Sequence, residues 1–134
     1  MPRAATSAAT AESTALVFDR AGMMTRLMDD EVLVRAVTES FLKDIPRQIA
    51  ALRGHLEAGD AAGAERQAHT IKGAAANVGG EALRAVASEM EKAGTAGDLD
   101  RITARMGDLT TQFHRLQEAM ATSLPRVDSG PDDS

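Results

Sequence analysis

Three residues in the middle of the chain have the types and the spacing that a phosphoryl-accepting site needs. His69 is followed by Lys72 and Gly73 within the run QAHTIKGAAANVGG. Residues three and four apart on an α-helix lie side by side on one face. The spacing therefore places a nucleophilic ring beside a cation and beside a position without a side chain. This pattern suggests a histidine that accepts a phosphoryl group and passes it on.

Each of the three residues has a role in that chemistry. An exposed histidine with the ordinary pKa of about 6.5 is largely neutral at pH 7 and can act as a nucleophile. A phosphoryl group carries about two negative charges, and the Lys72 ammonium would attract it by roughly 1–4 kcal/mol at ~4 Å. Gly73 costs about 1 kcal/mol relative to alanine inside a helix. Clear access to His69 is a reason for a glycine at this position.

The ring of His69 is predicted to point outward. At about 100° per residue, the apolar seam of its helix is centred about 140° away from it; the seam consists of Ala64, Ala68, Ile71, Ala75 and Val78. We expect a partner to dock on small and apolar residues near His69, with charged residues at the rim. The candidate docking residues are Ala62, Ala76, Met23, Met24 and Leu27, with Glu65, Arg66 and Arg84 at the rim. Each methionine taken singly is better explained as core packing.

Most lone surface histidines have no catalytic role, and it is the spacing around His69 that favours one. His55 and His114 lack such surroundings, and we interpret both as solvated residues. An alternative is a structural helical adaptor in which His69 is idle.

Apolar residues at steps of three and four predict helices along most of the chain. Pro46 falls inside the longest of these patterns, which keeps its phase, so a kink is predicted rather than two helices. Gly94 is predicted to end the fourth helix. The expected helices span 20–28, 30–57, 61–78, 81–93 and a last segment from residue 99.

These segments predict an all-α fold, an antiparallel four-helix bundle with a short additional N-terminal helix. The bundle is expected over residues 17–123, in one domain. Residues 1–16 are rich in Ala, Thr and Ser and are expected to form a disordered arm or linker. Residues 124–134 are expected to form a disordered tail.

Composition excludes several other classes of function. The chain has no cysteine, which excludes disulfides and thiolate metal sites. Its net charge of −5 and its aromatic content of 2% argue against nucleic-acid binding. No apolar run approaches the length of a membrane span, and no nucleotide-binding glycine loop is present. We expect a cytoplasmic monomer that binds no membrane and is not an autonomous enzyme.

The run from Ala68 to Gly79 resembles the signature of histidine-containing phosphotransfer (HPt) domains of hybrid sensor kinases and phosphorelays. Phe18 and Asp19, Phe41 with Pro46, and the step from Gly79 to Leu83 also resemble this family. The resemblance covers about residues 18–122. It implies a four-helix bundle in which His69 takes a phosphoryl group from a receiver-domain aspartate and passes it to another receiver.

The resemblance also implies that Lys72 stabilises the phosphoryl group and that Gly73 gives steric access. Mg²⁺ is expected in the partner receiver, and no cofactor is expected on this chain. A hybrid sensor histidine kinase is a further possible partner. The chemotaxis-type kinase-substrate domain carries a similar His-x-x-Lys-Gly helix and stays an alternative, in which the phosphoryl donor is an ATP-binding kinase domain.

Overall fold

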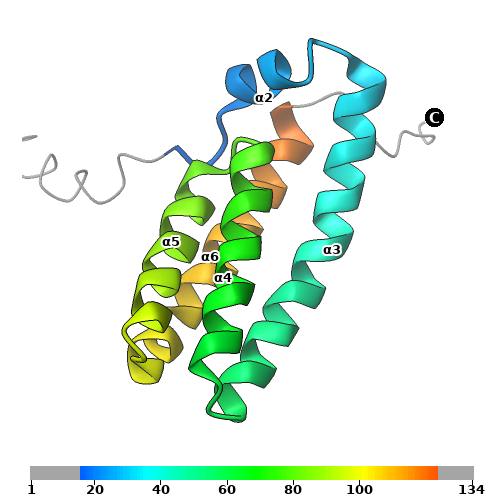
Figure 1. Ribbon diagram of the computed structural model, residues 1–134. Coiled ribbons are helices and arrows are strands. Elements are labelled where there is room, and N and C mark those ends of the chain that lie inside the picture. The colour runs from blue at the N-terminus through cyan, green and yellow to red at the C-terminus, as the bar shows by residue number, and fades with distance from the viewer. Residues whose placement is uncertain (1–15, 124–134) are drawn as a thin grey trace, which may run out of the picture.

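Helices account for all the regular structure in the computed structural model, which describes residues 16–123. Figure 1 shows the long helices side by side, alternating in direction, with a short helix across one end. The predicted all-α four-helix bundle with an additional N-terminal helix is confirmed. The helices are α2 (Arg20–Arg26), α3 (Glu31–Glu57), α4 (Ala61–Asn77), α5 (Glu81–Thr95) and α6 (Leu99–Ser123).

The two ends predicted to be disordered lie outside the described residues, except for Leu16. This residue was expected in the N-terminal arm, but its carbonyl oxygen accepts a hydrogen bond from the backbone nitrogen of Ala82 at 2.7 Å. The ordered domain therefore includes Leu16, which is tied to the first turn of α5.

The longest helix, α3, is continuous through Pro46. The side chain of Asp30 caps its first turn by accepting hydrogen bonds from the backbone nitrogens of Val32 and Leu33. Apolar residues on both sides of the proline face the same core, and burying them stabilises the helix across the break in its hydrogen-bond ladder. The prediction of one helix rather than two is confirmed.

The prediction that Gly94 ends the fourth helix is wrong. Helix α5 continues to Thr95, and the chain turns at Gly97, where φ is +72°. Gly94 is buried inside the helix and faces α4: a Cβ atom at this position would be 2.9 Å from the Cα of Glu65. The glycine lets two helices approach closely, and the conformation needed to end the helix falls on Gly97.

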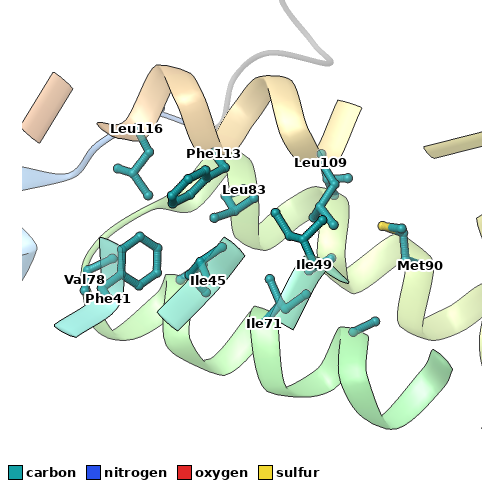
Figure 2. Packing of buried hydrophobic residues seen from close by; sticks show 14 of the residues in the cluster. Phe41, Ile45, Ile49, Ile71, Val78, Leu83, Met90, Leu109, Phe113 and Leu116 are labelled. Atoms are coloured by element: carbon teal, nitrogen blue, oxygen red, sulfur yellow. The ribbon is translucent and has the colours of Figure 1, made fainter. Parts of the chain in front are cut away.

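The core lies between the four long helices and consists of aliphatic, methionine and two phenylalanine side chains. Figure 2 shows side chains of all four helices converging in it, among them Phe41 and Phe113. The centroids of these two rings are 6.2 Å apart, at an interplanar angle of 51°. The seam predicted for the helix that carries His69 is confirmed, since all five of its residues are buried.

Helix α2 closes the end of the bundle where α4 meets α5. Met23 of α2 is fully buried in the core. The backbone nitrogen of Asp19 donates to the carbonyl oxygen of Gly79 at 2.7 Å. Gly79 has φ +78°, and a Cβ atom there would be 2.5 Å from the carbonyl oxygen of Asp19. A glycine is therefore required at the α4–α5 turn both by its conformation and by the closeness of the segment before α2.

Candidate functional site

His69 lies on the outer surface of α4, as the helical periodicity predicts. Its side chain is 66% exposed. Gly73, one turn further along the same helix, leaves the surface beside it open, since a Cβ atom there would have no neighbour within 4 Å outside the helix's own turn. A large partner can therefore reach the ring without displacing other side chains of this chain.

A residue that the sequence did not single out completes the site from the neighbouring helix. Glu91 of α5 reaches both functional side chains of α4. Its Oε2 atom is 2.8 Å from Nδ1 of His69, and its Oε1 atom is 2.6 Å from Nζ of Lys72. One carboxylate thus joins the candidate nucleophile and the candidate phosphoryl-binding cation.

The contact with Glu91 determines which ring nitrogen is the nucleophile. A carboxylate can only accept hydrogen bonds, so the neutral ring of His69 must donate from Nδ1. The other nitrogen, Nε2, then has no hydrogen and keeps its lone pair. Nε2 is therefore the atom available to attack phosphorus.

Glu91 is charged under ordinary conditions. Its pKa is lowered, chiefly because its carboxylate accepts a hydrogen bond from Lys72; partial burial opposes the shift, and the hydrogen bond from His69 adds to it. The side chain of Glu91 is only 21% exposed, so its charge is less screened than that of a surface carboxylate.

A second set of contacts fixes the register between α4 and α5 one turn away. The hydroxyl group of Thr95 donates to Oε2 of Glu65 at 2.8 Å and lies 3.2 Å from the carbonyl oxygen of Glu91. Glu65 also packs against Gly94. These contacts hold the turn that carries Glu91 against the helix that carries His69.

The predicted docking residues divide into two groups. On α4, Ala62 and Arg66 are exposed, while Glu65 and Ala76 are half-buried. These four residues share the helix with His69 and remain candidates for contacting a partner.

Met23 of α2 and Leu27, which caps the C-terminal end of this helix, belong to the hydrophobic core, so they do not present an open surface to a partner. Their burial closes the end of the bundle. It also stabilises α2, because a helix this short is not stable in isolation and depends on packing against the core. Met24 is half-buried and packs on the core.

Exposed apolar residues occur instead where α2 leads into α3. Met28, Val32 and Leu33 are large and exposed. Beyond them a groove of about 360 Å³ lies between α3 and α4. Its lining residues are Ala36, Val37, Ser40, Phe41, Asp44, Ile45, Ala74, Asn77 and Val78.

The other two histidines lie away from this site. Nδ1 of His55 is 3.2 Å from a carboxylate oxygen of Asp60, which caps α4 by accepting from the backbone nitrogen of Gly63. We predicted that His55 is a solvated residue, but it has a partner at the α3–α4 turn. His114 is exposed, and its ring centroid is 5.8 Å from that of Phe113.

Comparison with known proteins identifies the family. The family model of the Hpt domain matches residues 36–122. The chain belongs to the Hpt domain family. Among solved structures it is similar to histidine-containing phosphotransfer protein B (HptB) from Pseudomonas aeruginosa PAO1, with a TM-score of 0.73 and 24% sequence identity. The alignment covers 78% of this chain and 91% of that one. No match was found among curated proteins.

The function of this Hpt domain is histidine phosphotransfer in a phosphorelay, and Hpt domains interact there with receiver domains. The match includes α4 and α5, which carry His69, Lys72 and Glu91. Within residues 16–123, no cluster of three or more His, Cys, Asp or Glu side chains is arranged to hold a metal ion. None of the helices in that part of the chain has the length and apolar character of a membrane span.

Proposed function

We propose that His69 is the phosphorylated residue of this Hpt domain. It accepts a phosphoryl group from the aspartyl phosphate of one receiver domain and passes it to an aspartate of another. The observation that carries this assignment is the contact of 2.8 Å between Nδ1 of His69 and Glu91, on a ring that is 66% exposed. The contact orients the ring and directs the lone pair of Nε2 toward solvent.

The transfer step follows from this geometry. The lone pair of Nε2 attacks the phosphorus atom of the aspartyl phosphate, a nitrogen–phosphorus bond forms, and the phosphorus–oxygen bond to the aspartate breaks. The bonding electron pair leaves with the aspartate carboxylate, which needs no proton. The Nδ1 proton stays on the ring and faces Glu91. Donation to the second receiver is the same step in reverse.

Lys72 and Gly73 assist in different ways. The Lys72 ammonium attracts the phosphoryl oxygens once they arrive; in the unphosphorylated structure it is bound to Glu91. Gly73 leaves room for the receiver's active site. We expect the receiver to supply Mg²⁺ and the acidic residues that bind it.

We further propose that the receiver docks over the outer face of α4 and into the groove between α3 and α4. Three groove residues at the C-terminal end of α4 and its cap, namely Ala74, Asn77 and Val78, lie five to nine positions after His69. At 1.5 Å per residue this is about 8–14 Å along the helix, within the reach of one domain interface. Ala62, Arg66 and Ala76 flank the reacting ring on the same helix.

Transfer from a phosphorylated receiver in the presence of Mg²⁺ tests the assignment. A panel of receiver domains from the same organism is phosphorylated and mixed with the protein, and the acid-labile label on this chain is measured. The label should reach the wild type, His55→Gln and His114→Gln, and should be absent from His69→Gln. Label on His69→Gln would show that another residue is the acceptor. Labelling by an ATP-binding kinase core alone, with no receiver able to exchange the group, would favour the chemotaxis-type alternative.

A further inference from the structure

Glu91 contacts both side chains that would surround a phosphoryl group on His69. In the present structure its two oxygens are divided between Nδ1 of His69 and Nζ of Lys72, at 2.8 Å and 2.6 Å. The proposed phosphorylation atom, Nε2, is on the opposite side of the ring from Nδ1. A phosphoryl group there adds about two negative charges near a carboxylate that is already charged. Glu91 therefore acts on the phosphorylated state as well as on the free ring.

The first effect of Glu91 concerns the proton on Nδ1. A carboxylate next to an ionisable ring favours the charged form of that ring. The phosphorylated ring loses its phosphoryl group more readily when Nδ1 is protonated, because the leaving group is then a neutral imidazole rather than an anion. By accepting the Nδ1 hydrogen bond, Glu91 favours the labile form.

The second effect concerns Lys72. A lysine ammonium close to the phosphoryl oxygens would stabilise the phosphorylated state. In this structure the Lys72 ammonium is instead bound to Glu91, which competes with the phosphoryl group for it. Both effects make the phosphoryl group easier to remove.

Other charged groups around the ring are placed differently. On α4 itself, Glu65 lies one turn before His69, and its carboxylate accepts from Thr95. Arg66 is exposed. From α5, the helix packed on this side, Glu91 is the carboxylate that contacts the ring. On the opposite flank α3 presents Asp44, which accepts a hydrogen bond from Gln48 of the same helix.

We propose that Glu91 is a positioning residue that sets how readily His69 gives up its phosphoryl group. It does so by keeping Nδ1 of the phosphorylated ring protonated and by holding Lys72 away from the phosphoryl oxygens. This inference rests on the proposed function and extends it to the balance between holding and donating the group. A charged residue here favours rapid donation to a receiver over storage on the histidine.

The lifetime of the phosphorylated protein tests this without any receiver. Phosphoramidate phosphorylates the protein directly: its phosphorus–nitrogen bond breaks, the bond to Nε2 forms, and ammonia leaves. The half-life of the phosphohistidine is then followed by phosphorus NMR between about pH 5 and pH 9, the range in which imidazole groups titrate. The variants are Glu91→Gln and the control Glu89→Gln. Glu89 is also on α5 but pairs with Arg105 at 3.0 Å.

Glutamine at position 91 keeps an acceptor for Nδ1 but removes the charge. We expect the half-life of Glu91→Gln near pH 7 to be about fivefold longer than that of the wild type, the scale of the net contribution of one ordinary hydrogen bond. Its half-life profile should also shift to lower pH. Glu89→Gln should follow the wild type. A Glu91→Gln profile that superimposes on the wild-type profile overturns the proposal.

The part played by Lys72 is separated by a double-mutant cycle. Lys72→Ala is made in the wild-type and Glu91→Gln backgrounds, and the gain in half-life caused by Glu91→Gln is compared. A larger gain when Lys72 is present supports the competition for its ammonium. Equal gains overturn that half of the mechanism.

The position of the hydrogen on the His69 ring can be measured on the wild type, so this test does not depend on whether a variant folds. Nitrogen NMR of the unphosphorylated protein above about pH 8, where imidazole is neutral, reports which ring nitrogen bears the hydrogen. Hydrogen on Nδ1 of His69 is expected, and hydrogen on Nε2 overturns the role of Glu91. If phosphoramidate gives the expected profiles but no receiver exchanges the group, the proposed function fails and this inference stands.

Discussion

Gly94 of α5 lies directly against the backbone of Glu65 of α4. A Cβ atom at position 94 would be 2.8 Å from the Cβ of Glu65 and 2.9 Å from its Cα. Neither atom can be moved by rotating a side chain. The absence of a side chain at Gly94 therefore lets the two helices approach closely. This approach brings Glu91, one turn earlier on α5, within hydrogen-bonding distance of His69.

We predict that Gly94→Ala destabilises the protein by about 1–3 kcal/mol, the usual cost of overpacking, although alanine is the better helix former. Forcing α4 and α5 apart should also weaken the contact of Glu91 with His69. Urea denaturation measures the free energy of unfolding.

Gly107→Ala is the matched control for this experiment. Gly107 lies inside α6, and a Cβ atom there would have no neighbour within 4 Å outside the helix's own turn. This substitution should stabilise the protein by up to about 1 kcal/mol. If both alanine variants are stabilised, the close packing at Gly94 does not limit the approach of the helices.

Gly73→Ala should separate stability from function. Nothing within 4 Å would meet a Cβ atom at Gly73, so alanine should raise the free energy of unfolding by about 1 kcal/mol. Transfer from a phosphorylated receiver should slow, because the new methyl group lies in the receiver's approach to His69. Thermal unfolding measures the change in stability. Transfer reactions that are stopped at a series of times measure the rate of phosphoryl transfer. Faster or unchanged transfer would mean that Gly73 has no role in access.

The helical framework of the site could be predicted from periodicity alone. His69 was placed on the outer face of its helix because the buried residues of α4 repeat at three and four positions, and these residues are in the core. The same reasoning predicts that His69, Lys72 and Gly73 lie side by side, since all three are on one helix. Contacts within one helix are fixed by its geometry.

Glu91 could not be predicted in the same way. It lies 22 positions after His69, and its meeting with the ring depends on the register between α4 and α5. That register is set by Gly94 against Glu65 and by the hydrogen bond from Thr95. In the sequence Gly94 near a helix end indicated a stop, and Glu91 was indistinguishable from a solvated carboxylate.

Stability should fall in acid because two carboxylates have lowered pKa values in the folded protein. The pKa of Asp60 lies below its ordinary value of 3.8, chiefly because its carboxylate accepts the backbone N–H of Gly63. The pKa of Glu91 lies below 4.5, chiefly because of its hydrogen bond from Lys72. Groups with lowered folded pKa values stabilise the fold above their unfolded pKa and lose this contribution as pH falls.

We therefore expect the thermal midpoint of the wild type to decrease as the pH falls from about 5 to about 3. Asp60→Asn should show a smaller decrease, because asparagine still caps α4 but does not titrate. Thermal unfolding followed by circular dichroism at each pH measures this. Parallel profiles for the two proteins would mean that Asp60 contributes nothing to the acid sensitivity.

The groove between α3 and α4 is tested by placing the same charge at two exposed alanines of α3. Ala36 lines the groove, whereas Ala50, further along the same helix, is not among its lining residues. An unpaired charge buried at an interface is costly, so Ala36→Glu should slow transfer from a receiver by about tenfold or more. Ala50→Glu should leave the rate unchanged, with the same change in net charge.

The same two variants should not differ in phosphorylation by phosphoramidate, because that reaction needs only the exposed ring of His69. A loss of receiver transfer without a loss of phosphoramidate labelling therefore assigns the effect of Ala36→Glu to docking. Transfer at the wild-type rate by Ala36→Glu would instead place the receiver away from the groove. The contact would then be confined to the outer face of α4 around Ala62, Arg66 and Ala76.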